Sequence, residues 1–295
     1  MTNENHENVY ATFLIGDDYV KGTLALHQSI KDTGTNHPFV VFTSQCSNDV
    51  IALLTDQGCL VHEVDRVAPP KEIAIKNQKA GFSRWNDTFS KLSILSFTQF
   101  NKIVLLDSDM MVVSNIDTLF SSKHMSAVAA GHRARPDWVD MNSGLLVIKP
   151  SIEEFDRAIG ILEEIGSNEN LLSNYPTGIG DQDIIQLLCQ DWPLSEQLHL
   201  PESFNLFQDC LTRYEKWGFI KKGQTFIIHF ELNPKPWDYS FADYAKVVYR
   251  AIRYRSTAEI NAISHYRALL ESQPVLPKQK SLNRRPRTRT SGRKF

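Results

Sequence analysis

An apolar run that ends in two carboxylates is the feature that most constrains this chain. Residues 103–106 are Ile, Val, Leu and Leu, Asp107 and Asp109 follow, and the chain continues as Met110–Val113. A run that is apolar at every position predicts a strand buried on both faces, which is typical of a parallel sheet covered by helices. Carboxylates at the carboxyl end of such a strand lie where open α/β sheets bind ligands. The stretch therefore predicts an α/β fold with a ligand site at one edge of its sheet.

The two carboxylates would point to opposite faces if the strand continued through them. For Asp107 and Asp109 to converge on one ligand, the backbone at Ser108 must turn out of the sheet. Their oxygens would then suit a divalent cation, which could hold a diphosphate. A solvated surface turn is the alternative, because Asp-x-Asp also occurs by chance. An EF-hand calcium loop fits poorly, since Met and Val follow Asp109 where that loop needs oxygen ligands and a glycine.

Length and composition indicate one large α/β domain. The chain has 295 residues, of which 42% are hydrophobic and 22% charged, so it can bury a sizeable core. Its net charge of −2 is uneven. Eight Lys and Arg residues and no acid lie from Lys278 onward, which leaves about −10 for residues 1–277. An acidic body argues against nucleic acid as the main ligand.

We expect a globular domain at residues 1–273 and a basic, disordered tail at 274–295. The tail is rich in Pro, Arg, Ser and Thr, so it cannot bury enough apolar surface to offset its ordering entropy. Two interpretations of the tail stay open. It is either a solubilising extension or a segment that docks on an anionic surface, such as membrane lipid or a polyanionic polymer.

Other signals favour a cytoplasmic protein. The start, MTNENHENVY, lacks a signal-peptide pattern, and no segment approaches the roughly 20 apolar residues of a membrane span. The four cysteines show no C-x-x-C spacing and lie in or beside apolar runs, which predicts reduced, mostly buried thiols. They are Cys46, Cys59, Cys189 and Cys210. The oligomeric state stays open, with a homodimer among the options.

Strands and helices alternate before the central strand. We expect strands at residues 9–15, 39–43 and 59–64, and helices between them at 20–30 and 48–57. This alternation predicts one doubly wound nucleotide-binding half. A helix at 85–100 should then lead into the central strand. Further strands are expected at 126–130, 145–148 and 226–228, and further helices at 151–165, with a capping box, and at 181–188, 241–253 and 257–271.

Several motifs occur in a fixed order along the chain. They are TFSKLSILSFTQFNKIVLLDSDMMVVSNIDTLF, MNSGLLVIKPS, GDQDII and HFELNPKPW, preceded by YATFLIGDDYVKGTLALHQSIK. Together they resemble the glycogenin-type glycosyltransferases of family 8 over roughly residues 9–240. The resemblance implies a single GT-A domain, a Rossmann-like, mostly parallel mixed sheet flanked by helices. Its nucleotide-binding half would be about 9–120 and its acceptor half about 121–273. It also implies a retaining enzyme that uses a uridine-diphosphate (UDP) sugar and Mn²⁺, or Mg²⁺ in its place.

Carried over by motif, the metal ligands are Asp107, Asp109 and His229, and Ser108 borders the donor with the two carboxylates. Two carboxylates and an imidazole suit Mn²⁺ better than structural Zn²⁺. A lone histidine after an apolar strand is more often structural, but its H-F-x-x-x-x-K-P-W context favours ligation. Lys235 would place its ammonium on the diphosphate and stabilise the leaving group. The alternative for Lys235 is a surface lysine in a proline turn.

The resemblance assigns five further residues to the donor. Lys91 would contact it, and Tyr19 would border the uracil with its ring face. A solvated helix lysine and a core tyrosine are the respective alternatives. Asn142, Ser143 and Gly144 begin a strand, where glycine permits close backbone approach and asparagine can bind sugar hydroxyls.

Asp181 and Gln182 begin a helix and complete, with Lys235, the candidate catalytic set. Asp181 would hold donor-sugar hydroxyls, and Gln182 would lie beside the anomeric carbon. The alternative for Asp181 is a helix N-cap. No carboxylate nucleophile is obvious beyond Asp181. We therefore favour front-face attack through an oxocarbenium-like state over a covalent intermediate.

The chain departs from the family pattern at three places. Leu232 replaces the glycine of H-F-x-G-x-x-K, and Gly178 lies where an acidic residue is expected. The tyrosine that glycogenins glucosylate on themselves is missing from LPESFNLFQDCLTRY, where Tyr214 is the nearest candidate. Self-glucosylation is therefore disfavoured.

The sequence thus predicts retaining, Mn²⁺-dependent transfer of a hexose, glucose before galactose, from a UDP-sugar to a hydroxyl of a glycan, protein or small molecule. One alternative is a UDP-galactose-dependent transferase acting on glycan or lipid. A second is a nucleotidyltransferase or sugar-nucleotide hydrolase, although Gly16-Asp17-Asp18 is acidic where a basic phosphate loop is usual. A third is a non-catalytic sugar-nucleotide or glycan binding module, which would not need a leaving-group clamp.

Overall fold

A six-stranded sheet lies at the centre of the molecule, in a computed structural model that describes residues 7–129, 139–214, 216, 218, 220–221 and 224–274. The basic tail beyond residue 274 is outside the described residues. The strand order is β3-β2-β1-β4-β7-β6. The first four of these strands run parallel, whereas β7 is antiparallel to β4 and β6 to β7. The strands are β1 (Glu7–Ile15), β2 (Phe39–Ser44), β3 (Leu60–Glu63), β4 (Phe100–Leu106), β6 (Ser126–Ala129) and β7 (Met141–Ile148).

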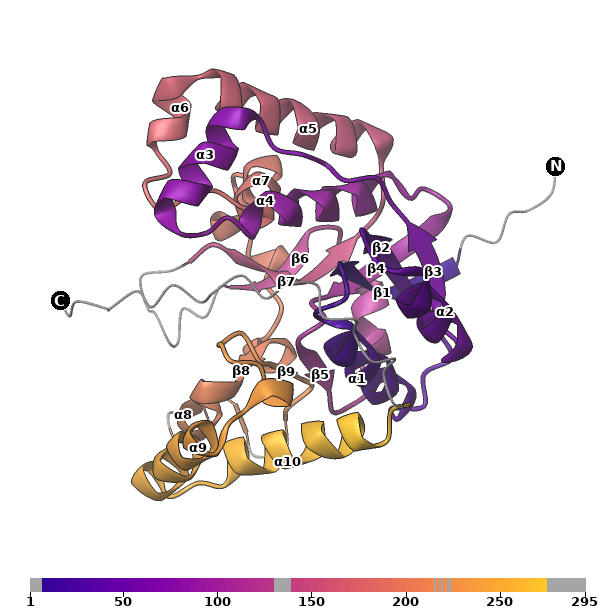
Figure 1. Ribbon diagram of the computed structural model, residues 1–295, viewed down its shortest axis with the longest axis vertical. Coiled ribbons are helices and arrows are strands. Elements are labelled where there is room, and N and C mark those ends of the chain that lie inside the picture. Colours follow the sequence, from indigo (N-terminus) through magenta and orange to yellow (C-terminus); the bar gives the residue numbers. More distant parts are fainter. Residues whose placement is uncertain are drawn as a thin grey trace.

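Helices cover both faces of this sheet (Figure 1). The helices on one face are α3 (Lys71–Ala80), α4 (Trp85–Thr88), α5 (Ile152–Ser167), α6 (Glu169–Ser173) and α7 (Asp181–Leu188). The other face is covered by α1 (Val20–Lys31) and α2 (Asn48–Asp56). Ile103 and Leu105 of β4 enter the core on the first face, and Val104 and Leu106 enter the core on the second. The doubly sided burial that the apolar run predicted is confirmed.

The helix expected at residues 85–100 differs from the prediction. It consists of the four-residue α4 followed by a 3₁₀ helix, Phe89–Ser96. Every residue from Phe89 to Leu95 is buried. The segment is therefore enclosed on all sides, and no solvated helix face exists there for Lys91 to occupy.

At the start of α5 the capping box is half formed. The Ser151 hydroxyl accepts the Glu154 N–H at 3.4 Å, as expected of an N-cap. The Glu154 carboxylate, however, pairs with His124 at 2.6 Å. Glu154 therefore pairs with His124 and does not accept the Ser151 N–H, as it would in a complete capping box.

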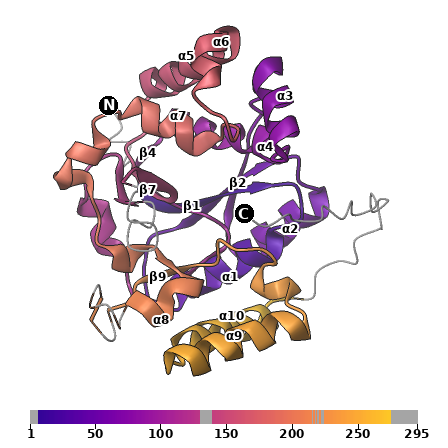
Figure 2. The same cartoon turned by 90° about the vertical axis from the view of Figure 1, so that its left-hand side faces the viewer.

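A second, small sheet lies beside the first and was not predicted. It has the order β5-β9-β8, with β5 antiparallel and β8 parallel to β9. Its strands are β5 (Met110–Val112), β8 (Leu206–Phe207) and β9 (Ile227–His229). It packs in a third core with α8 (Leu211–Tyr214), α9 (Phe241–Tyr254) and α10 (Ala258–Glu271). Figure 2 shows α9 and α10 side by side below α1.

All four cysteines are free thiols, as predicted. Cys59 and Cys210 are buried, and Cys46 and Cys189 are half-buried. Within the described residues, none of the helices has the length and apolar character needed to cross a bilayer.

Candidate metal and donor site

Asp107 and Asp109 converge because the chain changes sheets between them. Strand β4 ends at Leu106 in the large sheet, and β5 begins at Met110 in the small one. The Met110 N–H donates to the Asp107 carbonyl at 3.0 Å and closes a tight turn around Ser108. This is the turn out of the sheet that convergence of the two carboxylates requires.

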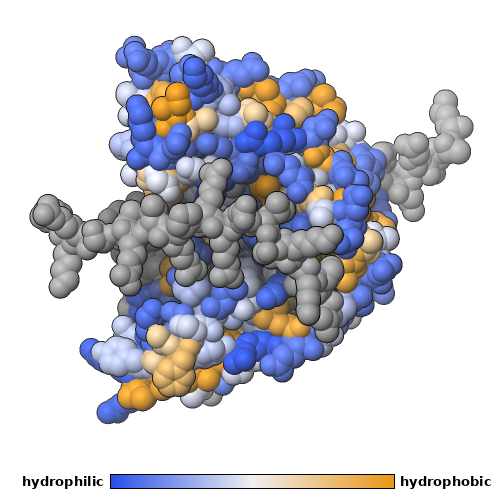
Figure 3. Space-filling model, in the orientation of Figure 1, coloured by the Kyte–Doolittle hydropathy of each residue, from blue (hydrophilic) through white to orange (hydrophobic). Residues whose placement is uncertain are grey.

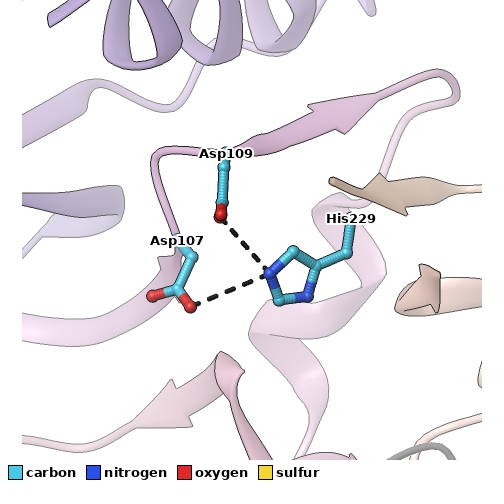
Figure 4. A group of neighbouring side chains, drawn as sticks. All are labelled: Asp107, Asp109 and His229. Atoms are coloured by element: carbon cyan, nitrogen blue, oxygen red, sulfur yellow. Dashed lines mark ion pairs between the residues drawn. The ribbon is translucent and has the colours of Figure 1, made fainter. Parts of the chain in front are cut away.

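His229, the last residue of β9, completes the cluster (Figure 4). Its Nε2 lies 3.3 Å from Asp109 Oδ1 and 4.0 Å from Asp107 Oδ2. One ligand atom from each of the three residues lies within 4.8 Å of the other two. Two carboxylate oxygens and one imidazole nitrogen at this spacing fit a divalent cation such as Mn²⁺.

Asn205 fixes the orientation of the His229 ring. Its Oδ1 lies 3.0 Å from His229 Nδ1 and accepts the proton of that nitrogen, which directs Nε2 toward the two carboxylates. Burial alone would lower the pKa of His229, but Asp109 and Asp107 outweigh it and raise that pKa. A proton and a cation therefore compete for the same Nε2.

Lys235 is a buried lysine, so its interpretation as a surface residue is wrong. Its ammonium donates to Asp109 Oδ2 at 2.7 Å and to the carbonyls of Phe230 and Glu231 at 2.8 and 2.9 Å. Burial would raise the pKa of Asp109, but His229 and Lys235 together lower it below its usual range. Asp109 is thus held ionised, as a metal ligand must be.

Lys91 is also buried and joins three segments of the site. Its ammonium donates to Asp107 Oδ1 at 2.8 Å and to the Ser143 carbonyl at 2.9 Å, and it lies 3.5 Å from Asp181 Oδ2. Burial would lower the pKa of Lys91, but the two carboxylates outweigh it and raise that pKa. The alternative of a solvated helix lysine is wrong.

The start of β7 lies directly against the cluster. Asn142 Oδ1 accepts the Gly144 N–H at 3.0 Å and the Asn205 amide at 2.8 Å. The Gly144 carbonyl accepts the Asp107 N–H at 2.8 Å. A Cβ on Gly144 would lie 2.8 Å from His229 Cε1, so a larger residue would displace the imidazole.

The first turn of α7 faces the same region. Gly180, not Asp181, is the N-cap, and the Asp183 carboxylate accepts the Gly180 N–H at 2.7 Å. The N-cap interpretation of Asp181 is therefore wrong. Its Oδ2 instead accepts the Ser143 hydroxyl at 3.3 Å, and Gln182 Oε1 accepts the Ser143 N–H at 3.0 Å.

Tyr19 immediately precedes α1 and is half-buried. Its ring meets Trp237 edge-on at 5.5 Å, and the Lys235 ammonium lies 5.9 Å from its centroid. Burial, followed by the charge of Asp109, raises the pKa of Tyr19. The structure therefore brings Tyr19 to the edge of the cluster, beside Lys235.

Sequence reasoning missed two residues that shape the site. One is Asn205, which lies in the LPESFNLFQDCLTRY stretch but was assigned no role there. The other is Gly22 in α1, where a Cβ would lie 2.4 Å from the Ser108 carbonyl. A glycine inside a helix costs about 1 kcal/mol relative to alanine, so its presence at residue 22 was an available signal of close packing.

The three departures from the family pattern have clear structural settings. Gly178 has a φ of +96°, and a Cβ there would lie 2.8 Å from Asn77 Oδ1, so this backbone cannot accept an acidic residue without strain. Leu232 is 43% exposed. Tyr214 is 2% exposed and packs in the core of the small sheet.

The fold is that of a glycosyltransferase, and the chain belongs to glycosyl transferase family 8, whose model matches residues 11–240. Mouse glycogenin-1 is 29% identical over an alignment of 252 residues that covers 82% of this chain and 69% of that protein. The alignment with human glycogenin-1 covers 65% of that protein. Arabidopsis thaliana inositol phosphorylceramide glucuronosyltransferase 1 is 28% identical over 80% of this chain and 43% of its own length. Galactinol synthase 2 from the same plant is 27% identical over 79% of this chain and 74% of its own length.

Solved structures agree on the fold. The galactosyltransferase LgtC, in complex with donor and acceptor sugar analogs, superposes with a TM-score of 0.54 over 92% of this chain and 98% of that chain, at 14% identity. The GT-A architecture expected from the sequence is confirmed.

Proposed function

We propose that this chain transfers a hexosyl group from a UDP-sugar to an acceptor hydroxyl, with retention at the anomeric carbon and with Mn²⁺ as cofactor. The observation that carries the proposal is the cluster of Asp107, Asp109 and His229 with two buried ammonium groups, Lys91 and Lys235, on its carboxylates. The cation, held by the three cluster residues, would neutralise the diphosphate as the glycosidic bond breaks.

Lys235 would act on the departing diphosphate. Its ammonium donates to Asp109 and to two backbone carbonyls. A cation on Asp109 would therefore bring a donor phosphate close to Lys235, with only the Asp109 carboxylate between them. We infer that the ammonium exchanges Asp109 Oδ2 for a phosphate oxygen as negative charge develops. Because the site is buried, that interaction is stronger than it would be in water.

The donor sugar would lie between β7 and α7. Asn142 uses its amide oxygen inside the protein, which leaves its amide N–H groups for a sugar hydroxyl. Asp181 is engaged by Lys91 and Ser143. That engagement supports a role in positioning the sugar hydroxyls over a role as nucleophile, and hence front-face attack with Gln182 beside the anomeric carbon.

Glucose is the first candidate for the transferred sugar, because the glycogenins are among the more similar relatives. Galactose is the second, because the names of galactinol synthase 2 and of LgtC indicate galactosyl transfer. The burial of Tyr214 disfavours modification of that residue and supports a separate acceptor, which is a glycan, a protein or a small molecule. Four free thiols support a cytoplasmic location.

The test combines two measurements on the purified protein. UDP release is assayed with Mn²⁺ and a panel of UDP-sugars, with and without candidate acceptors, and intact mass is recorded in parallel. We expect UDP release with UDP-glucose or UDP-galactose, its loss when the metal is chelated, and no added hexose mass. Release of nucleoside monophosphate would contradict transfer in favour of pyrophosphate cleavage. Donor binding without turnover under any condition would indicate a binding module.

A further inference from the structure

Helix α9 carries an apolar stripe that no described residue covers. Phe241 is 90% exposed, Ile252 73%, Tyr249 66% and Val248 46%. Spacings of seven, eight and eleven residues place all four on one side of a helix with 3.6 residues per turn. Val247 and Ala251, on another side, are buried. Exposed apolar surface gathered in this way marks an interaction site more often than scattered single residues do.

Figure 3 shows the same feature on the surface. Hydrophobic residues gather at the lower left corner of the molecule, where Figure 1 places α9. We call Phe241, Val248, Tyr249 and Ile252 the α9 stripe.

Cations flank the α9 stripe on both sides. At about 100° per residue, Lys246 and Arg253 lie next to Tyr249 around the helix, just outside the stripe. On the other edge Tyr244 carries the guanidinium of Arg267 at 5.1 Å from its ring centroid. The single acidic residue of α9 is Asp243, which pairs with Lys246 at 2.9 Å and caps the helix start with Ser240.

The described residues end just after α10, beside α1. Helix α10 packs on α9 and ends at Glu271, and the 21 residues beyond 274 hold eight Lys and Arg residues and no acid. The rest of the chain is acidic. Charge is therefore distributed unevenly along the sequence, with a cationic tail after an acidic body.

We propose that the α9 stripe docks on the surface of an anionic lipid bilayer. Phe241, Ile252 and Val248 would enter the boundary between headgroups and acyl chains, and Tyr249 would lie at the headgroup level. Lys246, Arg253 and the basic tail would lie against acidic headgroups. An apolar stripe bordered by cations is the arrangement that holds a helix in the plane of a membrane interface.

A second copy of this chain fits the α9 stripe less well. Pairing two identical stripes about a twofold axis would bring the cationic borders of both copies together. No acidic residue of α9 other than the already paired Asp243 could compensate that repulsion. An anionic lipid surface supplies the missing negative charge.

The experiment is co-sedimentation of the full-length protein with vesicles of phosphatidylcholine alone or mixed with phosphatidylserine. We expect binding to the mixed vesicles at low ionic strength, little to the neutral ones, and weakening by salt. The double variant Phe241→Ser/Ile252→Ser should lose about tenfold or more in partition, because two anchoring side chains no longer leave water. The matched control is Leu194→Ser, which removes an 85% exposed leucine elsewhere and should bind as the parent does.

A second variant separates the stripe from the tail. It replaces Arg284, Arg285, Arg287 and Arg289 with Gln in the full-length chain. We expect partial loss of binding in this variant and a further loss when it is combined with Phe241→Ser/Ile252→Ser.

Three outcomes would overturn the proposal. One is no binding to mixed vesicles. The second is binding that depends on the tail arginines but not on Phe241 and Ile252. The third is a lipid-free dimer, seen by sedimentation velocity, that Phe241→Ser/Ile252→Ser abolishes, since this assigns the α9 stripe to a second copy. None of these readouts depends on transferase activity.

Discussion

The large and the small sheet contribute to the site in different ways. The large sheet has both faces buried and supplies Asp107 and the backbone of Asn142–Gly144 from the ends of two neighbouring strands. The small sheet has strands of only two or three residues, yet it supplies His229 and the segment that holds Asn205. Asp109 lies at the junction, one residue before β5.

The two sheets differ in how firmly they position their metal ligands. The carboxylate of Asp107 accepts a hydrogen bond from Lys91, and the Asp107 N–H donates to the Gly144 carbonyl of β7 in the large sheet. The imidazole depends on a short strand and one amide. A cation at the junction would therefore link the two sheets. Substitutions in the two sheets should differ in their effects on metal affinity and on turnover.

The largest effect is expected at the junction itself, from Asp109→Asn. An amide is a poorer metal ligand than a carboxylate, and UDP-sugar turnover should fall by roughly 10³-fold with loss of Mn²⁺ binding. Lys235 keeps its two carbonyl partners, so the fold should persist. Mn²⁺ binding is measured by electron paramagnetic resonance, and turnover by UDP release.

The matched control for Asp109→Asn is Asp56→Asn on the exposed end of α2. It should change neither metal binding nor turnover. Normal Mn²⁺ affinity in Asp109→Asn would remove Asp109 from the ligand set.

A smaller effect is expected on the small-sheet side, from Asn205→Ala. His229 loses the acceptor that orients its ring, and the Mn²⁺ affinity should fall by about 10–100-fold. Turnover at saturating Mn²⁺ should fall much less, because the ligands themselves remain. Titration of activity against Mn²⁺ concentration separates the two. A fall in turnover with unchanged metal affinity would assign Asn205 to the donor instead.

The packing between α1 and the turn at Ser108 is tested by Gly22→Ala. Its Cβ would meet a backbone oxygen, so we expect a loss of about 1–3 kcal/mol in the free energy of unfolding. Gly160→Ala in α5 is the control, since nothing lies within 4 Å of its Cβ and it should stabilise by about 0.5–1 kcal/mol. Urea unfolding measures both. Equal effects would mean that α1 does not support the turn.

The same two regions differ in how far the sequence predicts them. Most strands of the large sheet are buried on both faces and are therefore apolar at nearly every position. This local pattern is visible in the sequence, so β1 to β4 could be predicted. The Asp-x-Asp turn could also be inferred, because Asp107 and Asp109 can converge only if the strand ends between them.

Only one strand of the small sheet was predicted, at residues 226–228 where β9 lies. The strands β5 and β8 are too short to show a period, so the pairing of the three strands into a sheet could not be predicted. Met110–Val112 looks like a continuation of β4, although it pairs with β9 in a different sheet. Asn205 reaches His229 across 24 residues of sequence, and Lys91 reaches Asp181 across 90. Such polar contacts depend on tertiary packing, and only the family motifs pointed to His229, Lys91 and Asp181 themselves.

The smallest effect is expected where the chain returns from β5 to the large sheet. Asp117 accepts hydrogen bonds from the Tyr10 hydroxyl at 2.6 Å and the Thr35 hydroxyl at 2.7 Å. Burial would raise the pKa of Asp117, but these hydrogen bonds outweigh it and lower that pKa. The stabilisation from a lowered carboxyl pKa is present above the unfolded-state value of about 3.9 and is lost as the pH falls through the folded-state value.

Asp117→Asn should therefore reduce the free energy of unfolding by about 1 kcal/mol at pH 7, and the difference from the parent should shrink on acidification below about pH 4. A double-mutant cycle with Tyr10→Phe, measured by urea unfolding, isolates the contact between the two residues. A coupling near zero at pH 7 would show that this contact does not tie the segment after β5 to the large sheet. The junction would then depend on the turn at Ser108 and on the pairing of β5 with β9.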